Sequence, residues 1–371
     1  MRNFQDEFDY LIHLVRCAVR GECPQELPEG FDFQRVYEYG EYHHIANIAF
    51  YSVEKLAKKP VAPLYARWET CRDRAVIRDI NQAFAADELR DAFQNAGIRS
   101  LEVQGTRIKP LYPQPDLRTM SDIDFIIDHE NLQKAWAVLE GLGYECKDEH
   151  GVEVDAFRPP NINIEVHTEY FPKDSKYHSV MRPPFSTVEK AGEYDINEFY
   201  LYNILHIVKH YRNGGCGIRR VLDIYYLNKH YGQRIDRKYI RSFLKMLADA
   251  ELVSELSALA DRWFGDTETE TARTETERYI LDAGLHGTKT NVVSNRLKRN
   301  YQGNLRIARM RYFLRRIIGT KEILYKTHPI LKRWKILYPF CWLHRVFCAF
   351  RPKKLKQLRK EIKVVMDTKP Q

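Results

Sequence analysis

The sequence predicts an α+β protein in which a small sheet domain is embedded between largely helical N- and C-terminal regions. Apolar residues recur at three- and four-residue steps before residue 97 and again after residue 197, which is the spacing of helices that bury one face. Between these regions, short apolar runs bounded by glycine and proline indicate strands. A chain of 371 residues, 44% hydrophobic and 29% charged, has room for two or three globular domains.

The first region, residues 1–97, is expected to be a helical framework. Helices are predicted over 8–19, 43–56 and 64–96. The last of them stops at Gly97, because glycine commonly terminates helices. No cluster of residues in this region demands chemistry, and we place His43 and His44 on an ordinary helix surface.

The sheet domain is predicted within residues 98–195. Strands are expected over 101–103, 122–128, 152–157 and 162–167, with a helical turn or two over 106–111 and a helix over 129–142. This order of elements is typical of a small α/β sheet domain. A helical domain is expected over 196–288, and a basic, aromatic-rich helical region over 289–371. The helices of the former are predicted over 199–211, 218–231, 239–250 and 252–264.

The formal charge of +9 is unevenly distributed along the chain. Residues 289–363 contain 22 lysines and arginines and two acids, a net charge of +20, which leaves −11 for the first 288 residues. Tryptophan, tyrosine and phenylalanine are interleaved with this basic charge, for example over 334–342. Three interpretations remain open: solvated basic helix faces packed on the acidic body, peripheral contact with an anionic membrane surface, or nucleic-acid binding.

Composition also indicates the compartment. Seven cysteines without a C-x-x-C pair argue against a disulfide framework and against a thiolate zinc site, so we expect reduced thiols in the cytoplasm. The sequence over 1–7 does not resemble a signal peptide, and no window reaches the 18 to 20 apolar residues of a membrane span. We therefore expect a cytoplasmic protein without a transmembrane segment, with peripheral contact at the inner membrane surface through 289–363 as an open alternative.

The most informative motif is Asp122-x-Asp124 at the head of a predicted strand. Residues two apart on a strand point to the same face, so these carboxylates lie side by side. Two adjacent carboxylates repel one another unless a cation or a proton lies between them. Oxygen ligands at this spacing suit Mg²⁺, which binds one or two carboxylates together with substrate phosphates and water.

Three neighbouring features strengthen this interpretation. Gly105-Thr106 ends the preceding strand, and a glycine at a strand-to-helix turn allows the backbone to approach a phosphate. Arg118 lies four residues before the first aspartate, close enough for a triphosphate. Glu165 lies on a later strand whose alternation could bring it beside the aspartates. Three carboxylates around two Mg²⁺ ions form the arrangement that catalyses phosphoryl or nucleotidyl transfer.

Taken together, these motifs resemble the uncharacterised bacterial nucleotidyltransferase family of the polymerase-β-like superfamily. The resemblance rests on Gln104-Gly105-Thr106, Tyr112-Pro113, Arg118, the run 122–127, the run 139–144 ending in Gly-Tyr, and Ile164-Glu165-Val166-His167. It extends more loosely to 205–210 and 219–223. It implies the minimal nucleotidyltransferase fold, a small mixed sheet with flanking helices.

The resemblance also implies a site and a reaction. Asp122, Asp124 and Glu165 would be the catalytic and metal-binding residues of a two-ion Mg²⁺ site, and the turn at Gly105 and Thr106 would hold the triphosphate of an NTP such as ATP. Lys109, Arg118 and His167 complete the expected nucleotide-binding set. The expected reaction is Mg²⁺-dependent transfer of an NMP to an unknown hydroxyl or phosphate acceptor, on a small molecule, RNA or a protein.

Several points remain open at this level. The family typically carries lysine where this chain has Gln104, so either Arg107 or Lys109 supplies the missing charge or the affinity for triphosphate is reduced. Asp155 competes with Glu165 for the role of third acid, and His167 could equally be a strand-end histidine. Lys209, Arg212, Arg219 and Arg220 could line the nucleotide cleft. The alternative function is a non-catalytic nucleotidyltransferase-like scaffold whose basic C-terminal region binds membrane or nucleic acid.

Overall fold

The structure is a computed structural model that describes residues 4–148, 153–186, 195–266, 272–284, 287–300, 305–318, 324, 328–349, 362 and 365–366. The chain divides into two compact units, each of which is considered by itself. The first unit comprises Met1–Val208 and Gly217–Leu285. The second comprises Lys209–Cys216 and His286–Gln371.

Four helices form the N-terminal part of the first unit, where the apolar spacing predicts three and misses the helix over 33–42. They are α1 (Glu7–Arg20), α2 (Phe33–Tyr42), α3 (Ala46–Val53) and α4 (Ala62–Asn95). The side chain of Asp6 caps α1, and Gly21 ends it with φ 73°, a left-handed conformation that glycine adopts without strain. The expectation of a surface position for His43 is wrong, because its side chain is fully buried and lies 3.0 Å from the Leu281 carbonyl.

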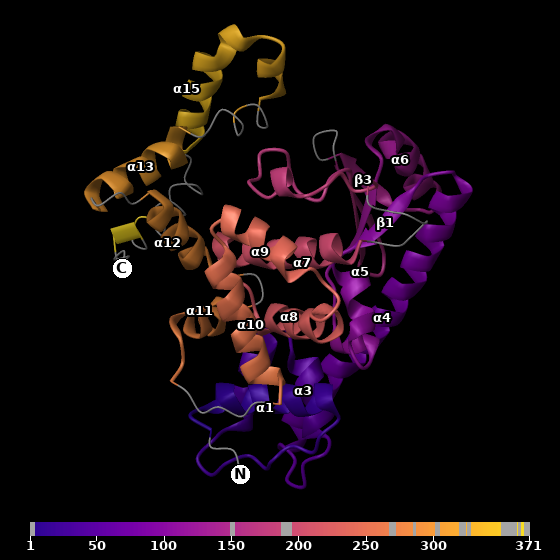
Figure 1. Ribbon diagram of the computed structural model, residues 1–371, viewed down its shortest axis with the longest axis vertical. Helices are drawn as coiled ribbons and strands as arrows, with labels where there is room; N and C mark the ends of the chain where they lie inside the picture. Colours follow the sequence, from indigo (N-terminus) through magenta and orange to yellow (C-terminus); the bar gives the residue numbers. More distant parts are fainter. Residues whose placement is uncertain are drawn as a thin grey trace. The chain divides into compact units, whose positions relative to one another are not determined.

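Five strands form one mixed sheet in the order β1-β2-β5-β4-β3 (Figure 1). They are β1 (Ser100–Val103), β2 (Ile123–Ile127), β3 (Glu145–Asp148), β4 (Glu153–Arg158) and β5 (Ile162–His167). β2 and β5 are parallel, and the other neighbours are antiparallel. The α+β class is therefore confirmed, and the predicted strands are observed within a residue or two. Val152, the predicted first residue of the third strand, lies outside the described residues.

The sequence prediction misses β3. Its four residues, Glu-Cys-Lys-Asp, contain three polar side chains and pair with β4 alone at the edge of the sheet. A short edge strand with so little apolar content gives no alternation strong enough to recognise.

The two faces of the sheet differ in chemistry, and this difference positions the site. One face carries the apolar residues of every second position, including Ile123, Phe125 and Ile164, and packs on α4 and on α6 (Leu132–Gly141). Residues at the intervening positions of β2, β5 and β4 project to the opposite face. That face carries the acidic residues.

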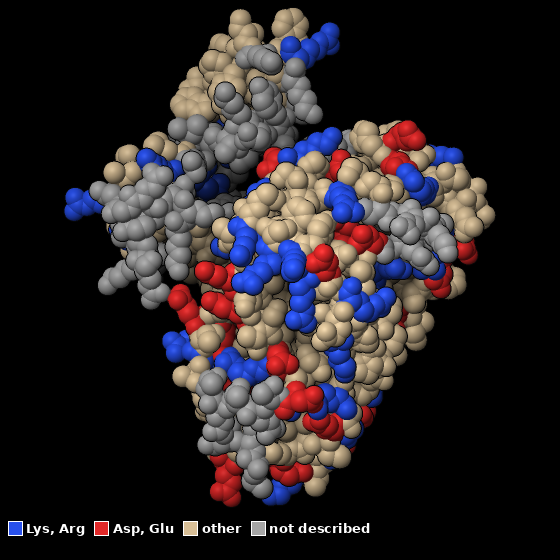
Figure 2. Space-filling model, viewed as in Figure 1, with Lys and Arg blue, Asp and Glu red and all other residues tan. Residues whose placement is uncertain are grey.

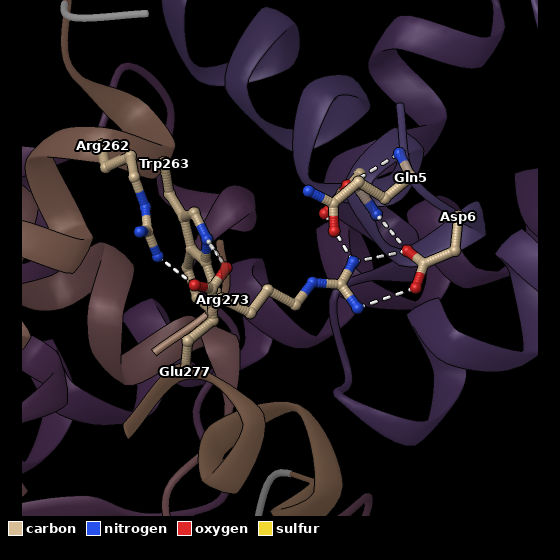
Figure 3. A network of polar contacts seen from close by, with 7 residues as sticks. Gln5, Asp6, Arg262, Trp263, Arg273 and Glu277 are labelled. Atoms are coloured by element: carbon tan, nitrogen blue, oxygen red, sulfur yellow. Dashed lines mark hydrogen bonds and ion pairs between the residues drawn. The ribbon is translucent and has the colours of Figure 1, made fainter. Parts of the chain in front are cut away.

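Further helices complete the first unit. They are α5 (Gly105–Ile108), α7 (Ile196–Asn213), α8 (Ile218–Tyr231), α9 (Arg237–Met246), α10 (Ala250–Phe264) and α11 (Glu275–Ala283), of which α7 continues beyond the unit boundary. Polar contacts join the segment before α11 to the start of α1, and α11 to α10 (Figure 3). Arg273 donates to both carboxylate oxygens of Asp6 at 2.7 and 2.6 Å, and Glu277 accepts hydrogen bonds from Trp263 and Arg262.

The second unit contains α12 (Lys289–Asn300), α13 (Leu305–Ile318) and α15 (Tyr338–Ala349), with two short 3₁₀ turns at Pro329–Lys332 and Lys335–Leu337. Much of the predicted basic region, including residues 350–361, lies outside the described residues. None of the described helices combines the length and apolar character that crossing a bilayer requires.

Candidate active site

Strand register brings three acids into one row across the sheet. Asp124 on β2 lies opposite Glu165 on β5, and Glu165 lies opposite Asp155 on β4. Residues in register on neighbouring strands project to the same face, with Cβ atoms about 5 Å apart. The expectation that Glu165 joins the aspartate pair rests on alternation alone, and in the structure Glu165 is the direct neighbour of Asp124.

The acids converge on His167, two residues beyond Glu165 on the same strand. Its Nε2 lies 3.3 Å from Asp124 Oδ1 and 3.5 Å from Glu165 Oε2, and its Nδ1 lies 2.9 Å from Glu153 Oε1. One ligand atom each from Asp124, Glu165 and His167 lies within 4.8 Å of the others, as a shared divalent ion requires. Among the described residues, this is the one such cluster of potential metal ligands.

Asp122 lies just before β2 and interacts electrostatically with Asp124 and Glu165. Burial and the carboxylates of Asp124 and Glu165 raise its pKa to about 7, while Arg220 and Arg219 act in the opposite direction. Burial likewise raises the pKa of Asp124, although the adjacent His167 opposes this. The predicted pair therefore lies within electrostatic reach of the third acid, and the group carries more negative charge than its surroundings neutralise.

The imidazole of His167 responds to these carboxylates. Burial by itself would lower its pKa, but hydrogen bonds to Asp124, Glu153 and Glu165 outweigh burial and raise the pKa well above its ordinary value. The neighbouring carboxylates therefore favour the protonated imidazole, whose positive charge lies where the acids repel one another. A divalent cation could supply that charge in its place.

The predicted phosphate-binding turn begins beside this cluster. Val103, the last residue of β1, lies in register with Asp124, so residues 104–106 start next to the acid. Gln104 adopts φ 52° and ψ −119°, a conformation that costs a non-glycine residue of the order of 1 kcal/mol or more. This backbone turn directs its side-chain amide onto Asp124 Oδ1, to which Nε2 donates at 2.9 Å. The turn is thus fixed to the carboxylate of Asp124.

Gly105 and Thr106 follow at the start of α5. A Cβ atom on Gly105 would lie 2.5 Å from Met120 Sδ and 2.8 Å from Arg118 Nη1, so any other residue there would displace these two side chains. The hydroxyl of Thr106 is buried and has no hydrogen-bond partner among the residues that the structure describes. A buried hydroxyl without a partner is costly, and a phosphate oxygen would satisfy it.

The two predicted nucleotide-binding cations are engaged elsewhere. Arg118 is 2% exposed and forms a bidentate ion pair with Asp223 at 2.8 and 3.0 Å, and Tyr112 donates to the same carboxylate. Lys109 is buried against Asp79, with 2.5 Å between Nζ and Oδ1. These contacts place both cations behind the turn and hold its supporting loop on α8 and α4.

Two further arginines, Arg219 and Arg220, lie near the acids. Arg219 donates to the carbonyl and hydroxyl of Thr119, and among the described residues its buried Nε has no hydrogen-bond partner. Burial and the charges of Arg118 and Arg220 lower its pKa to about 9. Three arginines therefore surround the single carboxylate of Asp223, and the surplus positive charge lies within electrostatic reach of Asp122. Lys209 and Arg212 belong to the second unit.

Sequence reasoning misses two residues of the site. Glu153 fixes the second ring nitrogen of His167, which strand alternation two residues before Asp155 could have indicated. Tyr202 on α7 is buried, hydrogen-bonds to Gln104 and lies near Asp124; burial first, and then that carboxylate, raise its pKa well above the ordinary value. No local motif marks Tyr202, because it approaches from a helix almost a hundred residues away.

This donor set fits Mg²⁺ with an NTP. Carboxylate oxygens from β2 and β5 are the ligands that Mg²⁺ prefers, and their excess negative charge calls for a cation. The buried hydroxyl of Thr106 without a partner fits a phosphate oxygen beside them. The site can thus hold a cation and a polyphosphate next to one another.

Comparison with known proteins agrees with this chemistry. A family model described as "Uncharacterised nucleotidyltransferase" matches residues 29–265, which is more than half of the chain and includes the acidic cluster, the turn and the surrounding arginines. No curated protein and no solved structure gives a significant match. The chain belongs to this uncharacterised nucleotidyltransferase family.

Proposed function

We propose that this protein is a Mg²⁺-dependent nucleotidyltransferase that moves an NMP from an NTP to an acceptor hydroxyl or phosphate. The observation that carries the proposal is the cluster of Asp124, Glu165 and His167 beside a turn that has an unsatisfied buried hydroxyl. Family membership supports a general role in nucleotidyl transfer. Catalytic activity, the identity of the metal and the number of metal ions in the site are parts of this proposal.

In the proposed site, Asp122, Asp124 and Glu165 hold Mg²⁺. When bound, the ions neutralise the triphosphate and lower the pKa of the acceptor hydroxyl. Glu165, whose side chain is more exposed than that of Asp124, accepts the proton of that hydroxyl. The acceptor oxygen forms a bond to the α-phosphorus as the bond to pyrophosphate breaks, and pyrophosphate leaves with the electron pair.

The phosphates are assigned to the turn and the arginines. Thr106 donates its hydroxyl proton, and the absence of a side chain on Gly105 leaves room for the close packing that positions this hydroxyl. Arg219 provides charge from behind the first aspartate. Arg118 and Lys109 do not contact the phosphates in this proposal. Their ion pairs fix the loop that supports the turn.

The position of Gln104 explains how the site can function without the family's lysine. Its amide donates to Asp124 and adds no charge, so it orients the carboxylate without competing with a cation. His167 is assigned a related role, as a protonated partner of the acids that contacts phosphate or yields its position when the metal binds.

The proposal also includes the nucleotide donor, the acceptor and the cellular compartment. The donor is an NTP such as ATP, the acceptor is a small molecule, RNA or a protein, and the compartment is the cytoplasm. The described cysteines are free thiols, which supports a reducing environment.

Thermal unfolding with each NTP tests nucleotide binding directly. At 100 times its dissociation constant, an NTP with Mg²⁺ should add about 2.7 kcal/mol of stability. Asp124→Asn should lose this gain, whereas Asp87→Asn, which removes an exposed acid of α4 outside the site, should keep it. A folded wild-type protein that gains no stability from any NTP with Mg²⁺ would favour the non-catalytic scaffold.

A further inference from the structure

We infer that the outer face of α15 and the turns before it dock on the surface of an anionic lipid bilayer. α15 is apolar on two opposite sides. Its inner side contributes Cys341, Tyr338 and Trp342 to a small core around Leu324 and Leu331.

On the outer side of α15, none of the described residues provides such cover. Phe340, Leu343 and Phe347 are 69%, 56% and 77% exposed, and their spacing of three and four residues places them in one stripe. Large apolar side chains at full exposure are unfavourable in water, and a contiguous set of them indicates an interaction surface.

The turns that precede α15 carry further exposed apolar side chains. Ile330, Trp334 and Ile336 are 52%, 55% and 80% exposed. Six large apolar side chains are therefore exposed within 18 residues of chain. In Figure 2 the described atoms over this part of the chain are tan and blue.

Charge identifies the occupant. Residues 323–360 contain eleven lysines and arginines and not one acid, although part of this stretch lies outside the described residues. Basic residues beside an apolar, aromatic helix face complement a negatively charged lipid surface. A nucleic acid would use the basic charge and the aromatic rings, but it offers nothing for the exposed aliphatic side chains of Leu343 and Ile336. The apolar and basic features together therefore favour a bilayer.

The mode of contact follows from the length of the helix. α15 has 12 residues, and none of the described helices is suited to cross a membrane. The helix would therefore lie in the plane of the interface, with Phe340 and Phe347 among the acyl chains and the basic residues at the headgroups. The surface belongs to the second unit and does not depend on the proposed transfer reaction.

Vesicle flotation of the full chain tests this inference. Wild-type protein should float with vesicles of phosphatidylcholine containing 30% phosphatidylglycerol, and at least tenfold less with phosphatidylcholine alone. The double variant Phe340→Ser/Phe347→Ser should lose at least tenfold in partitioning to anionic vesicles. The matched control Ile77→Ser/Phe84→Ser removes side chains of similar exposure, 59% and 69%, from α4 in the first unit, and it should float like the wild type.

Three results would overturn the inference. The first is equal flotation with neutral and anionic vesicles. The second is flotation of the Phe340→Ser/Phe347→Ser variant at the wild-type level, with its melting temperature unchanged. The third is RNA binding or self-association in place of vesicle binding. Asp124→Asn protein should float normally, so the failure of nucleotide binding and the failure of membrane docking are distinguishable.

Discussion

Replacing Asp122 with asparagine should stabilise the metal-free protein while abolishing its proposed activity. In the folded chain the pKa of Asp122 is about 7, against 3.8 for an ordinary aspartate, because burial and two neighbouring carboxylates disfavour its charge. This difference corresponds to an upper limit of roughly 4 kcal/mol in folding free energy. Partial exposure to solvent reduces the expected gain to about 2 kcal/mol.

The sign of the effect fixes its pH window. Between about pH 4 and pH 7 the folded state keeps a proton on Asp122 that the unfolded state has lost, so the free energy of unfolding of the wild type falls as pH rises. The asparagine cannot ionise and escapes this loss. The advantage of the variant should therefore be near zero at pH 4, grow through pH 7 and remain constant above it.

Urea unfolding in EDTA, followed by circular dichroism at pH 5 and pH 8, measures this difference. Mg²⁺ added at pH 8 should stabilise the wild type and leave Asp122→Asn unchanged, because the ion replaces the proton between the carboxylates. Asp87→Asn, an exposed acid of α4, serves as the control and should show no pH-dependent gain. A variant that is no more stable than the wild type at pH 8, or equally stabilised at both pH values, would refute the reasoning.

Three further predictions concern side-chain contacts within the first unit. Gly105→Ala should lower transfer at least tenfold, because the new methyl group would lie 2.8 Å from Arg118 Nη1; full activity in a steady-state assay would contradict the packing. Asp223→Asn should lower the free energy of unfolding by about 3 kcal/mol or more, since it leaves Arg118 buried without its counter-charge, and a loss below 1 kcal/mol in urea unfolding would argue against the buried pair. Arg273→Ala, which removes the contacts with Asp6, should cost about 1 kcal/mol and leave transfer unchanged; altered transfer would mean that this network reaches the site.

Much of the fold and the centre of the site could be predicted because their signals are local. Strand alternation places Asp122 and Asp124 on one face, and the apolar residues that alternate with them, Ile123 and Phe125, identify the buried face. The same alternation around Glu165 places its side chain on the face opposite the core. The parallel pairing of β5 with β2 then makes it the neighbour of Asp124. Helix spacing likewise predicts α8 at its observed bounds, Ile218–Tyr231.

The remaining features depend on contacts between distant parts of the chain. Arg118 is predicted to face a triphosphate, but its carboxylate partner, Asp223, lies 105 residues later on α8. Tyr202 reaches the site from α7, and His43 is buried against the carbonyl of Leu281. No periodicity or motif encodes such partners, because they are set by the packing of helices around the sheet and not by local propensity.

The central claim is tested most directly by the fate of the α-phosphate of an NTP. Purified protein, Mg²⁺ and ATP labelled at the α-phosphorus are incubated with a cell extract, and the molecules that acquire label are resolved. We expect covalent label from α-labelled but not γ-labelled ATP, with release of pyrophosphate, and no label with Asp124→Asn. Label from γ-labelled ATP, or equal labelling by the variant, would contradict it.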